Sequence, residues 1–274
     1  THQCPAFNPY NNGIVTDGYV ARITADGQWD WFSRFSSSDT VNYNSNGARD
    51  SGLHVEAYPD GSALVVAQYG EPLYGSTASI DLETDEGTVT LSSGSEEREM
   101  LVGRVHANGT WDWVASIDGD QWLSSPSATL SPDGSAYIHG HTYGSSWGDS
   151  NDLDFLSAPG GSDIQFSAVE RDGLASLISK ISDEGHWQWV QEEDHQTTHL
   201  QASDDGHVYA IVGGGNVTLG DINVAFHDED GEIAQATHVA KMDPDGDWLW
   251  IASGVFEDNE SDSLYGNAGW FNEM

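Results

Sequence analysis

Four histidines have the spacing of metal ligands. His139 and His141 alternate along one expected strand, and His195 and His199 lie in a polar segment. Imidazoles arranged in this way can bind zinc, which accepts nitrogen and sulfur ligands. No cysteine lies near them in the sequence and no HExxH motif is present. Isolated histidines in the core or on the surface are therefore the favoured interpretation.

No motif of a catalytic nucleophile or of a phosphate-binding loop is present. The chain lacks GxSxG, a cysteine with catalytic partners and a glycine-rich phosphate loop. A sialidase-type box is also missing, because TADGQWDW places its Asp and Gly side by side. We therefore expect no catalytic residues, and an enzyme remains only as an alternative.

Two acidic turns contain the DxDG core that can surround Ca²⁺ with carboxylate and carbonyl oxygens. Neither turn completes the twelve-residue calcium loop with its distal glutamate. Solvated hairpin turns explain the same residues equally well, so calcium is the one cofactor that the sequence leaves open. The candidate ligands are Asp228, Asp230, Asp243, Asp245 and Asp247.

The strongest pattern is a motif of one basic residue, one glycine and two tryptophans that occurs four times. The segments YVARITADGQWDW, LVGRVHANGTWDW, LISKISDEGHWQW and HVAKMDPDGDWLW span 19–31, 101–113, 177–189 and 238–250. The basic residue precedes the glycine by five positions, and the tryptophans follow it by two and four. Such a motif usually marks one supersecondary unit packed on copies of itself. Its members are Arg22, Gly27, Trp29 and Trp31; Arg104, Gly109, Trp111 and Trp113; Lys180, Gly185, Trp187 and Trp189; and Lys241, Gly246, Trp248 and Trp250.

The basic residues and the tryptophans of this motif each have two interpretations. A basic residue can pair with a neighbouring carboxylate or lie over an indole, where a cation–π contact contributes roughly 0.5 to 2 kcal/mol. Alternatively, all four can line a central channel and hold an anion. Tryptophans at repeated positions are expected in the core, with stacking on sugar rings as the alternative. The unrepeated Trp122, Trp147 and Trp270 are better placed for such stacking.

Alternating apolar residues before each motif glycine predict strands with one buried face. Asp-Gly, Asn-Gly or Glu-Gly then supplies the positive φ of a hairpin turn, and we expect both indoles on one face of the returning strand. A second kind of hairpin, over 53–70, 128–144 and 200–215, alternates with these tryptophan hairpins. Polar inserts such as 76–93 and 150–167 are expected to add a further hairpin or loop to each unit.

Four strands per unit, short turns and no helical periodicity are typical of radial or linear β repetition. The segments HVAKMDPDGDWLW (238–250) and SPDGSAYIHG (131–140) resemble the β-propeller repeats of secreted bacterial and archaeal proteins. The resemblance covers about half of the chain and departs from that family in the doubled tryptophan and the long inserts. We therefore expect an all-β fold of repeated antiparallel four-stranded units, with a β-propeller of about three and a half to four blades as the leading architecture.

The hairpins are unevenly matched, because four tryptophan hairpins have only three partners of the second kind. The first hairpin, 19–35, lacks its mate, and the tail 257–274 has no Asp-Gly turn to provide one. Three explanations stay open: the tail pairs irregularly with the first hairpin, another chain completes the unit, or the sequence is a longer propeller truncated at Met274. An open strand edge invites strand addition, and a contact between two different surfaces can propagate as a filament. We divide the chain into an N-terminal segment 1–18, a repeat domain 19–256 and the tail.

The chain carries 45 acidic and 8 basic side chains, which give a formal charge of -37. Such a field repels phosphates and anionic headgroups, so nucleic acid and inserted membranes are not expected as partners. Molar salt shortens the Debye length to about 3 Å, so this composition favours a saline habitat, with bound divalent cations as the alternative. No apolar stretch of membrane-spanning length and no retained signal peptide is found.

Two features are compatible with export. The single cysteine, Cys4, has no partner for an internal disulfide and is a free or an intermolecular thiol. Sequons provide candidate glycosylation sites at Asn108, Asn216 and Asn259. We therefore expect an extracellular or cell-surface protein.

The sequence supports a structural protein better than a catalyst. The unmatched hairpin predicts a subunit of a surface layer or filament that binds copies of itself by strand complementation. A carbohydrate-binding propeller or a polysaccharide-degrading enzyme is the alternative, with glycans as partners.

Overall fold

The computed structural model contains strands and turns, and no helix occurs among the residues that it describes. The strands pair in an antiparallel manner, apart from a single parallel bridge between Thr84 and Trp111. The predicted all-β class is confirmed. The described residues are 17–39, 50–69, 78–93, 99–119, 123–143, 152–168, 174–193, 195–227, 233 and 236–254.

Three sets of four antiparallel strands, here called the second, third and fourth units, share one strand order; the third and fourth units are separate sheets, and the second is part of a nine-stranded sheet that inserted strands extend. In each of them a hairpin of the second kind is followed by a tryptophan hairpin, and the two hairpins lie side by side. The second unit contains β4 (Ser51–Ala57), β5 (Ala63–Tyr69), β8 (Glu99–Val105) and β9 (Trp111–Gly119); the third contains β10 (Leu123–Leu130), β11 (Ala136–Tyr143), β14 (Leu174–Ile181) and β15 (Trp187–Glu193); the fourth contains β16 (Gln196–Ala202), β17 (Val208–Gly214), β20 (Ala236–Met242) and β21 (Trp248–Gly254).

The first unit is a tryptophan hairpin alone. Its strands are β1 (Gly18–Ile23) and β2 (Trp29–Phe35), and β1 begins one residue before the boundary expected for the repeat domain. Among the described residues, β1 pairs only with β2. The hairpin that lacks a mate in the sequence is therefore a two-stranded sheet.

Three further hairpins are inserted between the second and third strands of the four-stranded units. Two of them confirm the hairpins expected in the polar inserts. The insert of the third unit pairs with the last strand of the second unit and so connects these two units. The inserted strands are β6 (Ala78–Thr84) and β7 (Gly87–Ser93), β12 (Asp152–Leu156) and β13 (Ile164–Ser167), and β18 (Asn216–Leu219) and β19 (Ile222–Ala225); the two-residue β3 (Ser38–Asp39) pairs with β6.

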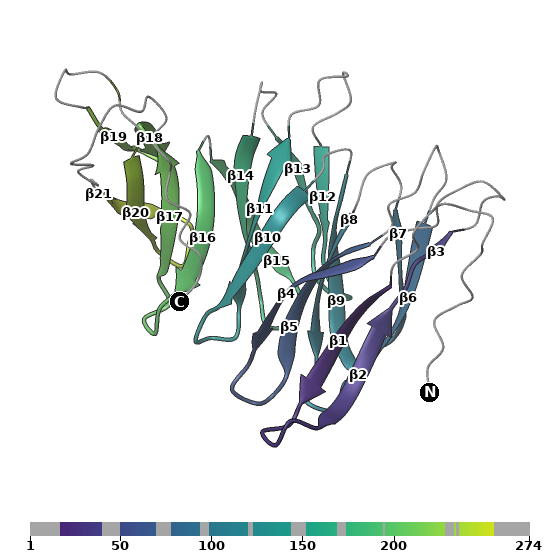
Figure 1. Cartoon of the computed structure of the whole chain (residues 1–274). Helices are drawn as coiled ribbons and strands as arrows, with labels where there is room; N and C mark the ends of the chain where they lie inside the picture. Colours follow the sequence, from purple (N-terminus) through teal and green to yellow (C-terminus); the bar gives the residue numbers. More distant parts are fainter. Residues whose placement is uncertain are drawn as a thin grey trace, which may run out of the picture.

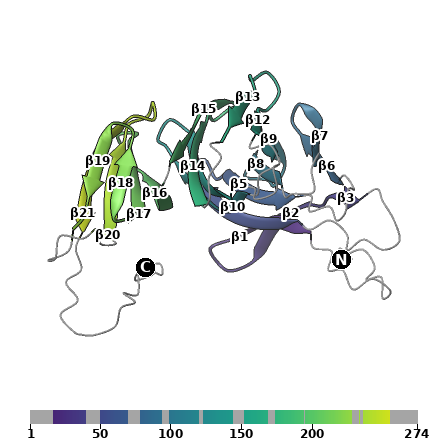
Figure 2. The same ribbon diagram turned by 90° about the horizontal axis from the view of Figure 1, so that it is seen from above.

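The units lie side by side along an open arc. Figure 1 shows them in chain order, with the first unit on the right and the fourth on the left. Figure 2 shows the sheets fanning out when they are seen from above. The first strands of successive units, β4, β10 and β16, are neighbours, and apolar clusters fill the spaces between the sheets. The described residues form no closed ring, so the number of blades in a propeller stays a prediction.

The hairpin turns within the units share one geometry. In each turn the glycine donates its N–H to the residue three positions earlier, and that residue donates its own N–H to the residue after the glycine. Both bonds together are typical of a three-residue hairpin loop that ends in a left-handed glycine. The predicted positive φ is confirmed, with values from 81° to 97°, at Gly27, Gly61, Gly109, Gly134, Gly185, Gly206 and Gly246.

Two histidines of the third unit are part of its core. His139 in β11 is buried, and its ring centroid lies 4.7 Å from that of His141. His141 Nε2 lies 2.9 Å from the carbonyl oxygen of Thr197 in β16. Burial, followed by the nearby rings of His141 and His199, lowers the pKa of His139 to about 3. His139 is therefore neutral at pH 7 and packs between the third and fourth units.

We expect protonation of His139 to make the stability of the fold depend on pH. Its pKa is 6.5 as a free side chain and about 3 in the fold. The folded state therefore loses stability as the pH falls from 6.5 toward 3, by up to about 1.4 kcal/mol per pH unit. Between pH 7 and pH 5 the free energy of unfolding should fall by about 2 kcal/mol more in the wild type than in His139→Phe, as measured by urea denaturation.

The comparison with His139→Phe removes the contribution of titrating groups that do not face His139; the neighbouring His141, whose pKa burial also lowers, stays coupled to this site. Asp118, whose burial raises its pKa to about 6, titrates in both proteins and cancels in the difference. Parallel pH profiles for the two proteins would show that His139 is not held neutral by the fold.

Candidate functional site

A β-bulge separates the two tryptophans of each motif. In all four tryptophan hairpins the register shifts directly after the basic residue, opposite the first tryptophan. The extra residue turns the strand, so the two indoles point to opposite faces of the sheet. In the second unit, Trp111 packs in the cluster shared with the first unit and Trp113 in the cluster shared with the third. The expectation that both indoles share one face is therefore wrong.

In the first three units, the second tryptophan of the motif binds the turn of the next unit. Trp113 donates its Nε1–H to the carbonyl oxygen of Asp183 at 2.8 Å. The acceptor stands two residues before the turn glycine of the third unit. The equivalent carbonyl accepts at the contacts between the other successive units, where Trp31 donates to Ala107 at 2.7 Å and Trp189 donates to Pro244 at 3.3 Å. These three contacts between successive units are here called joints.

The glycine of each of these turns lies under the indole of the preceding unit. A β-carbon at Gly185 would lie 2.6 Å from the ring of Trp113, and one at Gly109 would lie 2.7 Å from Trp31. At the joint between the third and fourth units the corresponding distance would be 3.4 Å. Glycine is therefore required at 109 and 185 both for its positive φ and for the space that the indole occupies, and at 246 for its positive φ.

The basic residues of the motif support the same joints. Arg22 Nη1 and Lys180 Nζ each donate, at 3.0 Å, to the turn carbonyl that also accepts the indole N–H. Arg104 instead lies 4.4 Å from the ring centroid of Tyr58 and forms an ion pair with Asp60 at 2.7 Å. These contacts include the expected pairing with a carboxylate, while backbone oxygens and a tyrosine ring take the place of the indole that was the other expectation.

The basic residue of the fourth unit has the same kind of surroundings. Lys241 Nζ lies 5.3 Å from the ring centroid of Tyr209 and 3.5 Å from a carboxylate oxygen of Asp205. A hydrogen bond from Ser203, with further bonds from His207, holds the pKa of Asp205 well below its usual range. The Asp205 carboxylate is therefore charged beside Lys241 at neutral pH. A shared anion bound by all four basic residues stays a prediction.

In the second and fourth units, the first tryptophan of the motif contacts the preceding unit. Trp111 meets Phe35 of the first unit edge to face, with ring centroids 6.5 Å apart. Trp248 donates its Nε1–H to Glu193 Oε1 of the third unit at 2.7 Å. One motif therefore joins its unit to both neighbours. In the third unit the contact is made by Trp187 on Phe155 of β12, with centroids 5.1 Å apart.

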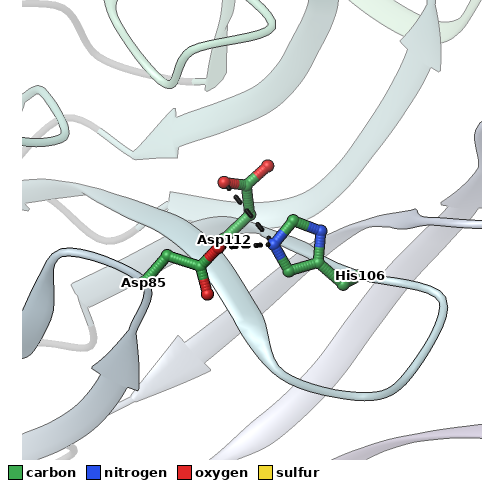
Figure 3. A group of neighbouring side chains, drawn as sticks. All are labelled: Asp85, His106 and Asp112. Carbon is green, nitrogen blue, oxygen red and sulfur yellow. Dashed lines mark hydrogen bonds and ion pairs between the residues drawn. The ribbon is translucent and has the colours of Figure 1, made fainter.

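One group of side chains in the described part of the chain has the composition of a metal centre. His106 Nε2 lies 3.0 Å from Asp85 Oδ2 and 3.8 Å from Asp112 Oδ1 (Figure 3). Two carboxylates and an imidazole can bind a divalent transition metal. The guanidinium of Arg104 lies 3.8 Å from Asp112, and all three side chains reach solvent. The arrangement already works as a hydrogen-bonded cluster that ties the β6–β7 insert to the turn before β9.

Sequence reasoning did not find this group, because its members come from two different turns and a strand. The residues predicted for calcium lie elsewhere. Asp243 uses its carboxylate within its own turn, where Oδ1 accepts the N–H groups of Asp245 and Asp247 at 3.0 and 2.9 Å. Cys4, Trp122, Trp147, Asp228, Asp230, Asn259 and Trp270 lie outside the described residues.

Two of the predicted glycosylation sites are on exposed backbone. Asn108 lies in the turn before β9, where its side-chain oxygen accepts the N–H of Thr110 at 3.0 Å. Asn216 begins β18 and is also exposed. Both positions are accessible, and their modification stays a prediction.

Comparisons with known proteins add no family to this picture. No protein-family model matches the chain, and no curated protein is significantly similar to it. The described segments include no helix that is long and apolar enough to cross a membrane. Function is therefore inferred from the joints between the units and from the ends of the arc.

We expect Gly185→Ala to destabilise the fold more than Gly27→Ala. Both glycines have a φ of 81°, so both variants carry backbone strain of about 1 to 2 kcal/mol. Only the β-carbon at Gly185 meets an indole, which adds about 1 to 3 kcal/mol of overpacking. Denaturant titration in dilute solution measures the difference, and equal costs would show that the indole does not depend on the glycine.

Proposed function

We propose that this chain is a non-enzymatic extracellular structural protein that assembles with copies of itself. The observation that carries the proposal is the first unit, in which one edge of β1 has no hydrogen-bonded partner strand among the described residues. Such an edge presents backbone groups that can bind an added strand. We regard the open arc as a β-propeller of about three and a half to four blades, in which another copy supplies the hairpin that the first unit lacks.

A cleft lies where the missing strands of the first unit belong. It has a volume of about 430 Å³ and is lined by residues of β1 and β4. Val55 of β4 lines this cleft and is 60% exposed. The equivalent residues of the next two units, Ala128 and Leu200, are buried in the clusters shared with the preceding unit. An apolar strand pair beside β1 would cover Val55 in the same way.

The charge of the chain supports assembly outside the cell in saline surroundings. Copies with a formal charge of -37 repel one another at low ionic strength. Molar salt screens this repulsion but leaves the apolar and backbone contacts of the joints intact. Assembly is therefore expected to grow with ionic strength, and bound divalent cations are the alternative source of screening.

The size of the assemblies in solution tests the proposal directly. Sedimentation velocity and electron microscopy of the purified chain, from low salt to about 2 M NaCl, should show ordered assemblies that grow with protein concentration and with salt. A monomer that stays stable over the whole range, without ordered assemblies, would remove the structural function.

We expect Val55→Glu to weaken strand complementation. The side chain is 60% exposed, so a charge there should change the stability of the monomer by no more than about 1 kcal/mol. In the assembly the same charge would be buried without a partner, which should weaken association about tenfold or more. Sedimentation at matched concentrations measures the change.

The matched control is Leu249→Glu. Leu249 is also an exposed apolar residue on a strand, and the first two units have Asp30 and Asp112 at its position. A charge is therefore tolerated there in a complete unit, the second. Equal loss of association in both variants would attribute the effect to added charge rather than to the cleft.

Exposed aromatic residues favour carbohydrate binding as the second candidate function. Tyr19 and Trp29 of the first unit are both exposed, and aromatic faces of this kind stack on sugar rings. A glycan array and a reducing-sugar assay test it, with Trp29→Ala as the variant that should lose binding. No glycan binding and no release of reducing sugars would remove this candidate.

A further inference from the structure

The first unit exposes residues whose equivalents in the other units are buried. Ile23 is 55% exposed and Trp29 is 69% exposed. Tyr19 is exposed beside them, and together with Gly27 these residues define the front face of the first unit. In the later units the same positions are buried against the preceding unit. The buried equivalents are Val105, Ile181 and Met242 for Ile23, Leu101 and Leu177 for Tyr19, and Trp111 and Trp187 for Trp29.

Gly27 on the front face has an open position above it. Among the described residues, no atom lies within 4 Å of a β-carbon built there. The turn glycines of the other tryptophan hairpins each lie under an indole. The carbonyl of Ala25 stands two residues before Gly27, which is the acceptor position in every joint.

The fourth unit has the opposite surface at the other end of the arc. Trp250 is 40% exposed, and its ring centroid lies 6.0 Å from that of Tyr209, over which Lys241 also lies. Val239 is exposed on the same side of β20 as Lys241. We call Tyr209, Val239, Lys241 and Trp250 the rear face of the fourth unit.

The rear face repeats an arrangement that already binds a neighbouring unit. In the third unit, Trp189 lies 6.0 Å from Tyr137, and Lys180 lies 5.4 Å from the same ring. These residues bind the fourth unit, because Trp189 and Lys180 both donate to Pro244 O and Tyr137 packs in the shared cluster. The rear face of the fourth unit therefore has the groups of a joint in place.

We propose that the rear face of one copy binds the front face of a second copy, with the indole of Trp250 seated on Gly27. The Nε1–H of Trp250 and the ammonium of Lys241 then donate to the carbonyl of Ala25, as their equivalents do within the chain. This inference rests on the proposed function, because it names the surfaces through which copies assemble.

A second copy is the occupant because each face matches the chain's own joints. The second and third units separate the two faces within one molecule (Figure 1), so a copy in this arc does not satisfy its own faces. The contact continues the stacking that already joins the four units. The contact joins two different surfaces and is therefore heterologous. Every assembly that does not close into a ring keeps one unbound front face at one end and one unbound rear face at the other.

Two variants that each disable one face test the proposal. Trp250→Ala removes the indole from the rear face, and Ile23→Glu places a charge on the front face. We expect each variant alone to associate at least about tenfold more weakly than the wild type at about 2 M NaCl. An equimolar mixture should regain one-to-one mixed dimers through this contact, because each variant keeps one intact face.

The mixture distinguishes the proposed contact from a symmetric one. Two rear faces bound to each other would let Ile23→Glu assemble alone, and two front faces would let Trp250→Ala assemble alone. Either result would overturn the proposal. Sedimentation velocity with a mass tag on one variant identifies the mixed dimer.

Further variants separate the contact from effects on folding. Trp250→Phe keeps the ring but not the N–H donor, so its association should fall between that of the wild type and that of Trp250→Ala. Gly27→Ala should weaken association, because its β-carbon occupies the seat of the indole. The matched control is Leu249→Ala, which removes the neighbouring exposed side chain and should associate like the wild type.

The results distinguish failure of this contact from failure of the proposed function. If the wild type assembles and both face variants assemble equally well, the structural function stands and the proposed faces are wrong. If the wild type remains a monomer at every salt concentration, both proposals are wrong.

Discussion

One extra residue in the returning strand of each tryptophan hairpin allows a unit to bind both of its neighbours. Without the bulge, two residues at a spacing of two would lie on one face of the strand, and both indoles would meet the same neighbour. The bulge rotates one indole to the opposite face. The turn glycine, the donated N–H and the apolar clusters between the sheets all depend on this rotation.

The joints use little of the charge that dominates the rest of the molecule. The indole donor is neutral and its acceptor is a backbone carbonyl, so salt screens this bond little. Acidic residues such as Asp245 and Asp247 lie instead in solvated turns. A chain with a formal charge of -37 can therefore keep its units together by contacts that are insensitive to ionic strength, while salt controls the repulsion between whole copies.

The hairpins could be predicted from the sequence because their signals are local. A glycine after an acidic residue, between two alternating apolar segments, fixed both the turns and their positive φ, as at Gly27 and Gly185. The bulge could not be predicted, because a shift of one residue leaves the apolar pattern almost unchanged. The cluster of Asp85, His106 and Asp112 was also hidden, since the fold alone brings an inserted turn beside a motif turn. The tyrosine rings under the basic residues were missed for the same reason.

The acceptor of every joint is a main-chain carbonyl, and the residues that provide it have side chains as different as those of Ala107, Asp183 and Pro244. The joint therefore recognises the path of the backbone and places no demand on the side chain at that point. Mutations there can alter the charge, bulk or solubility of a turn without altering how the sheets stack. A unit could thus be duplicated, exchanged or changed in its outer loops and still form the same indole–carbonyl bond with its neighbour.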